Sequence, residues 1–331
     1  RDPLFALSIL RQFNDSNQRG EVVRQQIQAY RQLHPEFKVV QFPAGNLARA
    51  PRNARQRWYL SALSGKYFQQ HAPIRKQTVP VGHSVRFGYL KTAATWIARL
   101  TSDGSLLPAL EAAWQRMVTR RMFVTGGLGA LAELEGFGND DELDPEYAYC
   151  EPCAALASLM WNWEMAQITG SAQYSDLFEW QLYNAASVGM GVEGTDYLYN
   201  NPLVCRGGVT RKAWFWVPCC PSNLSRIWAD VGGYIYSARD NSLTVHQYIS
   251  SALDEGPLHL AMQAGLPWQG NVRIEITAVE SEQPMRLLLR RPSWAGALRV
   301  SVNQEGVLPD PAPAAQPEPT DAGYDPREAT F

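Results

Sequence analysis

The chain has 331 residues, of which 45% are hydrophobic and 19% are charged, and its formal net charge is −2. This composition excludes a disordered chain, and the near-neutral charge gives no support for nucleic acid or an acidic polymer as a partner. No apolar run approaches the roughly 20 residues of a membrane-spanning helix, so we expect no membrane partner. The length is sufficient for two domains.

The N-terminal third has the weakest pattern. No Asp or Glu occurs between Glu36 and Asp103, and the stretch 37–64 has two prolines and little helical periodicity. We therefore leave residues 1–65 without defined elements and predict a loosely ordered or degenerate segment over 37–64. A nucleic-acid-binding arm is the alternative, but the stretch contains no motif for one.

Amphipathic helices are predicted from about Ser84 to Ser237, because apolar residues recur there at helical spacing in four stripes. The stripes consist of Leu106, Leu107, Leu110, Ala113, Trp114, Met117 and Val118; of Leu156, Leu159, Met160 and Trp163; of Tyr174, Leu177, Phe178 and Leu182; and of Leu224, Ile227, Trp228, Val231 and Ile235. Gly170 is suited to end the second helix, and Ser171 to cap the third. Short connections predict antiparallel helix hairpins stacked in series.

The pattern changes after Ala238, where strands replace helices. The segments 242–249, 272–277 and 285–290 are rich in strand-forming residues, and two of them alternate. They predict a β-sandwich with too few strands to close. The tail 309–319 is rich in Pro and Ala and is predicted to be extended or disordered.

The five cysteines are more typical of a metal site than of a disulfide framework. Their number is odd, and the neighbours Cys219 and Cys220 cannot readily pair with each other. A second cluster, Glu151-Pro152-Cys153, lies upstream. Unpaired thiols fit a reducing compartment, so we predict a cytoplasmic protein.

Both clusters are predicted to lie at helix starts. Proline is favoured at the first helical position, so Pro221 places Cys220 at an N-cap, and Pro152 places Cys153 in a first turn with Glu151 at the cap. The positive end of the helix dipole favours thiolates there. Three thiolates and one carboxylate suit tetrahedral zinc. The alternative is that these cysteines only pack as small buried residues.

Several motifs, taken together and in order, resemble those of one known family. They are Val81-Gly-His-Ser-Val-Arg86, Gly126-Gly-Leu-Gly129 followed by Glu135-Gly-Phe137, Tyr149-Cys-Glu-Pro-Cys-Ala154, Tyr174-Ser-Asp-Leu-Phe-Glu-Trp-Gln-Leu-Tyr-Asn184, and Trp214-Phe-Trp-Val-Pro-Cys-Cys-Pro-Ser-Asn223. They resemble segments of the glycoside hydrolase family 127 β-L-arabinofuranosidases. The resemblance implies a mainly α chain with a C-terminal β domain. Residues 1–237 would form a partial (α/α)6-barrel catalytic domain, and residues 238–331 an incomplete β-sandwich.

The resemblance also implies roles for individual residues in a retaining glycoside hydrolase. Cys219 would be the nucleophile and Glu135 the acid/base, while His83 and Glu179 would bind sugar hydroxyls. The Zn²⁺ ligands would be Glu151, Cys153, Cys219 and Cys220. The substrate would be an oligosaccharide or glycoconjugate that ends in a β-L-arabinofuranoside or a related plant-type sugar.

Each role has a plainer alternative. His83 can satisfy local backbone groups at a helix start, and Glu179 can be a solvated charge on a helix face. Glu135 lies in a loop rich in acidic residues, which is usually only solvated. Cys150 and Cys205 are expected to take no part in the site.

The chain also departs from the family pattern. Pro152 stands where the family has Thr, Val217 stands where some members carry another Cys, and the long N-terminal part of the barrel has no counterpart here. We therefore expect a truncated or frame-disrupted member whose exposed apolar helix faces favour instability or a homo-oligomer. The alternatives to an enzyme are a catalytically inactive, zinc-containing carbohydrate-binding or scaffold protein, and a structural zinc protein with no sugar role.

Overall fold

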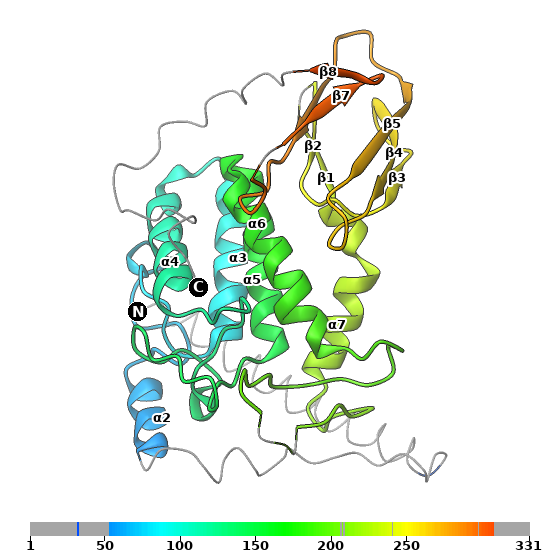
Figure 1. Cartoon of the computed structure of the whole chain (residues 1–331). Coiled ribbons are helices and arrows are strands. Elements are labelled where there is room, and N and C mark those ends of the chain that lie inside the picture. Colours follow the sequence, from blue (N-terminus) through cyan, green and yellow to red (C-terminus); the bar gives the residue numbers. More distant parts are fainter. Residues whose placement is uncertain are drawn as a thin grey trace. The chain divides into compact units, whose positions relative to one another are not determined.

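The computed structural model describes residue 32 and residues 53–307, apart from 206, 208, 240 and 297. The predictions for 37–52 and for the tail 309–319 lie outside the described residues. Within the described part, helices occupy the first portion of the chain and strands the last (Figure 1). None of the helices described is both long enough and apolar enough to cross a membrane.

Helix α5, Pro152–Thr169, is the central helix of the α part. Most of its residues are buried, and its apolar residues are not confined to one face, which is the pattern of a helix covered on all sides. Helices α3 (Ser84–Thr101), α6 (Ala172–Gln181) and α7 (Cys219–Ala229) pack against it. Gly170 ends α5 in the left-handed conformation, as predicted.

Three of the four predicted stripes lie on helices and the turns that adjoin them, and most of the residues of these stripes are buried. They belong to α4 (Leu107–Arg120), α5 and α6, and the rings of Trp114 on α4 and Tyr174 on α6 lie 4.8 Å apart. The fourth stripe was predicted to continue to Val231 and Ile235, and this part of the prediction is wrong. Helix α7 stops at Ala229, because two glycines follow and weaken the helix. Single turns complete the α part: 3-10 turns at Ile74–Lys76, Gly104–Leu106, Ala132–Leu134, Ser187–Gly189 and Val231–Tyr234, and a π-helical turn at Leu182–Ala186.

Helix α2, Ala54–Leu63, contradicts the prediction of an irregular segment over 37–64. Its large apolar side chains are exposed, so they form no buried stripe from which the helix could have been predicted. Arg57 holds the helix in place by donating two hydrogen bonds to the Glu142 carboxylate, at 2.7 and 2.8 Å.

Two long connections interrupt the predicted series of helix hairpins with short connections. Residues 121–151 link α4 to α5, and residues 187–218 link the π-helical turn that follows α6 to α7. The links from α3 to α4 and from α5 to α6 are short, as predicted. The first of these connections contains two of the predicted site residues, Glu135 and Glu151, so part of the site lies in an irregular segment.

The β part contains two three-stranded sheets and a hairpin. In the first sheet the order is β1-β2-β6, with β2 and β6 parallel, and in the second it is β3-β4-β5, antiparallel throughout. The bounds are β1 Tyr236–Arg239, β2 Ser242–Val245, β3 Ser251–Leu253, β4 Leu258–Ala264, β5 Val272–Val279, β6 Arg286–Leu289, β7 Val300–Val302 and β8 Glu305–Val307. Leu243 and Val245 of β2 share one apolar core with Leu260 of β4, so the two sheets pack together.

All three predicted strands are present with altered lengths. The segment predicted as 242–249 ends at Val245, because His246 and Gln247 leave the strand and bond to Ser175 of α6. Strand β1 starts at Tyr236, before the predicted domain boundary at 237/238, and the division into two domains stays a prediction.

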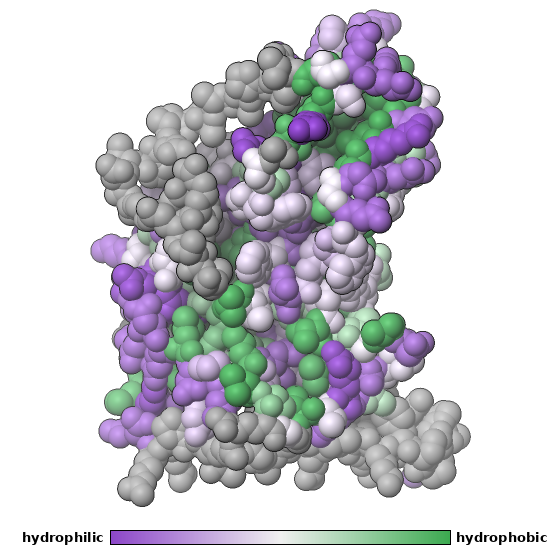
Figure 2. Space-filling view, viewed as in Figure 1, coloured by the Kyte–Doolittle hydropathy of each residue, from purple (hydrophilic) through white to green (hydrophobic). Residues whose placement is uncertain are grey.

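Apolar side chains remain on the surface, as expected from the sequence. Helix α3 exposes Trp96, Ile97 and Leu100. Figure 2 shows hydrophobic residues in separate patches over both the helical and the β part. Nothing in the described residues shows what covers them.

Arg290, which follows β6, joins the β part to α6. Its guanidinium forms ion pairs with Asp176 and Glu179, and its Nε donates to the His246 carbonyl at 2.7 Å. The Arg290 side chain is only 2% exposed. A buried cation of this kind is tolerated because each of its nitrogens has an acceptor.

We expect Arg290→Met to lower the free energy of unfolding by about 3–5 kcal/mol, because the buried Glu179 and the partly buried Asp176 lose their counter-charge. Urea unfolding measures the change. The matched control is Arg273→Met, which removes an exposed pair with Glu275 and should cost less than about 1 kcal/mol. Equal, small losses in both variants would contradict the importance of the buried pair.

His246 is buried beside the same network. Its Nδ1 lies 2.9 Å from Ser175 Oγ, and its Nε2 lies 2.7 Å from Ser237 Oγ. Burial lowers the pKa of His246 to about 4, from an ordinary value near 6.5, and the charge of Arg290 adds to this effect. The folded protein therefore keeps this ring neutral where the unfolded chain would protonate it.

Stability should consequently fall as the pH falls from about 6.5 to about 4, since only the unfolded state gains a proton there. We expect His246 to account for a loss of about 2 kcal/mol between pH 7.5 and pH 5. The measurement compares unfolding free energies of the wild type and His246→Gln at both pH values. If the two proteins lose equal stability, the lowered pKa of His246 is wrong.

Candidate metal centre and active site

Two helix starts bring the predicted metal ligands together. Helix α5 begins at Pro152, with Glu151 at the N-cap and Cys153 in the first turn, as predicted. Helix α7 begins two residues earlier than predicted, with Pro218 and not Cys220 at its N-cap. Cys219 is its first residue, and Pro221 lies in the first turn and not at the first position. A proline is tolerated there because the first N–H groups of a helix have no intrahelical partner.

The four side chains form one compact group. Their ligand atoms, one each from Glu151, Cys153, Cys219 and Cys220, all lie within 4.8 Å of one another. Cys153 Sγ is 3.4 Å from Cys220 Sγ, and Glu151 Oε1 is 3.4 Å from Cys219 Sγ and 3.6 Å from Cys220 Sγ. Cys219 is the only partly exposed member of the four, and Cys220 is fully buried.

The donor set fits a metal ion. All five cysteines are free thiols, so no disulfide competes for these sulfurs. Glu151 Oε2 is buried and has no hydrogen-bond partner, although a buried carboxylate oxygen is normally satisfied. A cation among the three sulfurs would satisfy this oxygen, and sulfur with carboxylate donors suits zinc.

Without a cation, the four groups must share protons. Burial raises the pKa of Glu151 and of Cys220 well above their ordinary values. A hydrogen bond between Cys153 and Cys219 lowers the pKa of Cys219 and raises that of Cys153, and Cys220 and Tyr199 also hydrogen-bond to Cys219. These hydrogen bonds favour the thiolate at Cys219 over a thiolate at Cys153 or Cys220.

His83 and Glu135 form a second group beside the first. His83 occupies the N-cap position of α3 without a capping hydrogen bond from its side chain, and its Nε2 lies 3.0 Å from Glu135 Oε2. His83, Glu135 and Glu151 each offer a ligand atom within 4.8 Å of the others, so Glu151 belongs to both groups. Glu135 has a φ of 46°, a strained conformation for a residue with a side chain.

A close backbone approach holds Glu135 in this place. Phe137 N donates to the Gly82 carbonyl at 2.9 Å, and a Cβ on Gly136 would lie only 1.9 Å from that carbonyl oxygen. Ser84 donates to the Glu135 carbonyl through its own N–H and its hydroxyl. The glycine after Glu135 is thus required for the loop to reach α3.

Glu179 lies outside both groups. It is buried, so the alternative that it is a solvated surface charge is wrong. Arg290 pairs with its Oε2, and Trp294 Nε1 donates to its Oε1 at 2.7 Å. Its expected contact with sugar hydroxyls stays a prediction.

Two residues at the site were missed from the sequence. The Tyr199 hydroxyl lies 3.1 Å from Cys219 Sγ, and Asn223 Nδ2 donates to Cys153 Sγ at 3.1 Å. Asn223 could have been found, because it lies one helical turn after Cys219 and Cys220. Tyr199 belongs to the irregular connection 187–218, where no periodic pattern singles it out.

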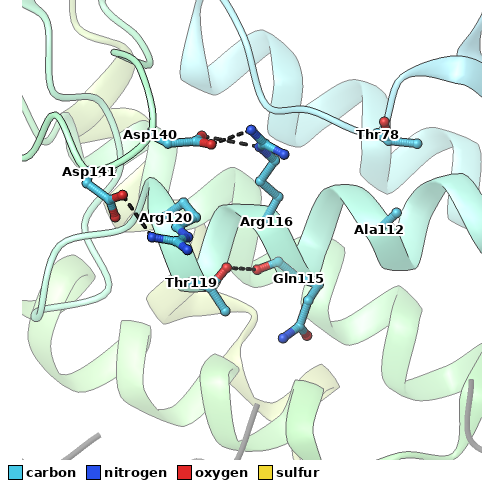
Figure 3. Close-up of a pocket in the computed structure, with 8 residues that line it drawn as sticks. All are labelled: Thr78, Ala112, Gln115, Arg116, Thr119, Arg120, Asp140 and Asp141. Atoms are coloured by element: carbon cyan, nitrogen blue, oxygen red, sulfur yellow. Dashed lines mark hydrogen bonds and ion pairs between the residues drawn. The ribbon is translucent and has the colours of Figure 1, made fainter. Parts of the chain in front are cut away.

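An open depression of about 740 Å³ lies elsewhere and contains none of the predicted site residues. Figure 3 shows its charged residues paired with each other, Arg116 with Asp140 and Arg120 with Asp141. Both arginines are already paired with carboxylates, so the depression is not a cluster of unpaired cations.

Comparisons with known proteins agree on one family. The family model for the β-L-arabinofuranosidase GH127 catalytic domain matches residues 25–233, and that for the GH127 middle domain matches residues 242–314. The non-reducing end β-L-arabinofuranosidase of Bifidobacterium longum subsp. longum is 34% identical over 254 residues, which are 72% of this chain and 39% of that protein.

Solved structures of the same kind are similar to this chain. A GH127 β-L-arabinofuranosidase from Geobacillus stearothermophilus T6 matches with a TM-score of 0.69 and 34% identity over 73% of this chain and 40% of its own. A second GH127 β-arabinofuranosidase matches with a TM-score of 0.69 and 30% identity, over 79% and 48%. The chain thus spans less than half the length of these relatives.

We expect the protein to bind one divalent metal ion per chain. Cys153→Ser should weaken binding by more than about a hundredfold, because even the loss of a residue behind a metal ligand costs about 10–100-fold. Competition with a chromophoric chelator measures the affinity. Cys205→Ser, which removes an exposed thiol outside the group, is the matched control and should bind like the wild type. Equal affinities in the two variants would rule out this ligand set.

Proposed function

The chain belongs to the glycoside hydrolase 127 family of β-L-arabinofuranosidases, and on that basis we propose that it is a retaining glycosidase. Its substrate would be an oligosaccharide or glycoconjugate with a terminal β-L-arabinofuranoside or a related plant-type sugar. The observation that carries the proposal is the position of Glu151, which belongs to the thiol group and to the group of His83 and Glu135. The proposed nucleophile, Cys219, and the proposed acid/base, Glu135, therefore both lie close to Glu151.

The proposed cofactor is zinc. The residues that would hold it are Glu151, Cys153, Cys219 and Cys220, and the unpartnered Glu151 oxygen supports the assignment. Zinc would supply a positive charge that keeps the coordinated thiols deprotonated at neutral pH.

In the proposed first step, Cys219 Sγ attacks the anomeric carbon. Its partial exposure supports this choice over Cys220, which is sealed from solvent. As the C–S bond forms and the C–O bond breaks, Glu135 gives its proton to the leaving oxygen. The product is a thioglycosyl-enzyme and a free alcohol.

In the second step a water molecule releases the sugar. Glu135, now a carboxylate, takes a proton from the water while the water oxygen attacks the anomeric carbon. The C–S bond breaks, and its electron pair returns to Cys219 Sγ. Two displacements at one carbon retain its configuration, as in glycosidases that use a carboxylate nucleophile.

Substrate hydroxyls would be bound by His83 and Glu179. The pair with Glu135 supports a role for His83, because His83 is held next to the proposed proton donor. Glu179 has two oxygens that already accept one hydrogen bond each, and a carboxylate can accept about four. It therefore retains the capacity to accept hydrogen bonds from a sugar.

The finer architecture belongs to the same proposal. The α part would be a portion of an (α/α)6 barrel, and the β part an incomplete β-sandwich. A cytoplasmic location rests on the unpaired thiols, and self-association rests on the exposed apolar residues of α3.

Cys219→Ser should lower kcat for nitrophenyl β-L-arabinofuranoside by at least about a thousandfold, because the nucleophile is lost. Glu135→Gln should lower it by about a hundredfold to ten-thousandfold. For Glu135→Gln the loss should be larger with a methyl arabinoside, since methanol needs a proton to leave and nitrophenol does not. Intact-mass analysis should detect a sugar adduct on Cys219.

Two variants serve as controls. Cys205→Ser removes a thiol outside the site, and Asp141→Asn removes a charge from the same connection as Glu135, on an exposed side chain. Both should keep wild-type activity. A wild-type protein that binds metal and sugar without turnover would refute the enzyme and favour the inactive carbohydrate-binding alternative.

A further inference from the structure

Tyr199 contacts both of the adjacent thiols, and it does so through different groups. Its hydroxyl lies 3.1 Å from Cys219 Sγ, while its backbone carbonyl accepts from Cys220 Sγ at 3.8 Å. Tyr199 itself is buried. Tyr199 therefore offers a hydroxyl to Cys219 and only a carbonyl acceptor to Cys220, although both are cysteines.

The hydrogen bond to Cys219 has a defined direction once this sulfur is a thiolate. A thiolate carries no hydrogen and can only accept, whereas a phenol can donate. Tyr199 is then the donor, and a hydrogen bond to a charged acceptor is stronger than one between neutral groups. Tyr199 cannot stabilise a thiolate at Cys220 in this way, because its backbone carbonyl has no hydrogen to donate.

Building on the proposed function, we propose that Tyr199 is a positioning residue that fixes Cys219 as the nucleophile and stabilises its thiolate when the sugar is released. The hydroxyl contacts the sulfur of Cys219, which is the partly exposed cysteine of the group. The same contact distinguishes Cys219 from Cys220, which has no exposed side.

The effect on the two steps differs. In the covalent intermediate Cys219 Sγ is a thioether, which accepts a hydrogen bond weakly. When water attacks the anomeric carbon and gives its proton to Glu135, the C–S bond breaks and the electron pair returns to Cys219 Sγ. The Tyr199 hydrogen bond strengthens during this step, so its loss should slow sugar release more than sugar transfer to the enzyme.

The first experiment does not depend on glycosidase activity. Cobalt(II) is bound in place of zinc, and the thiolate-to-cobalt charge-transfer band is recorded. A hydrogen bond withdraws electron density from the sulfur and raises the energy of this band. Tyr199→Phe should therefore move the band to longer wavelength. Tyr197→Phe is the matched control, because its hydroxyl bonds to the Gly194 carbonyl and to Ser225.

The second experiment follows the intermediate with nitrophenyl β-L-arabinofuranoside. In Tyr199→Phe the rate of sugar release should fall about tenfold to a hundredfold, as expected for a lost hydrogen bond to a charged group. Intact-mass analysis at steady state should then find a larger fraction of the enzyme carrying the adduct. Tyr197→Phe should match the wild type in both measurements.

The outcomes separate this inference from the proposed function. A wild-type cobalt band together with a wild-type release rate in Tyr199→Phe would overturn the inference while the glycosidase stands. An unchanged release rate with a shifted band would overturn the role in release. If the wild type forms no adduct and shows no turnover, the proposed function fails, and the role of Tyr199 in release fails with it.

Discussion

The structure depends on the confinement of four ionisable side chains in a buried space too small for four negative charges. Glu151 and the three cysteines place their ligand atoms within 4.8 Å of one another, at the starts of α5 and α7. Each helix start supplies partial positive charge, but two such ends cannot compensate four anions. The group must therefore hold protons or a cation. In its metal-free form, hydrogen bonds from the neighbouring thiols and Tyr199 favour one thiolate, at Cys219.

Glu151 extends this constraint to the acid/base group. Because the same carboxylate lies near His83 and Glu135, a shift of the first turn of α5 would disturb both groups. The backbone contact between Gly82 and Phe137 fixes the other side. Glu135 is thus held between two rigid helix starts although it belongs to a long irregular connection. This explains how a loop residue with a strained φ of 46° can keep a defined position.

Much of this could be predicted from the sequence where a local rule applies. Pro152 and Gly170 set the two ends of α5, because one fits the first helical position and the other fits a left-handed cap. The same proline rule failed at Pro221, since a proline is also tolerated deeper in a first turn. Tyr199 could not be predicted at all. Its place is set by a tertiary contact of an irregular connection, and neither periodicity nor a motif marks such a contact.

Glu179 shows that a partner distant in the sequence can determine whether a charged helix residue is buried or solvated. On α6 alone, Asp176 and Glu179 lie three positions apart on one face and would repel each other or face solvent. Arg290, which lies in the β part more than a hundred residues further along the chain, forms ion pairs with both carboxylates. Trp294 takes the remaining Glu179 oxygen. The β part therefore orients a carboxylate on a helix of the α part, so any contact that Glu179 makes with a sugar would depend on the docking of both parts.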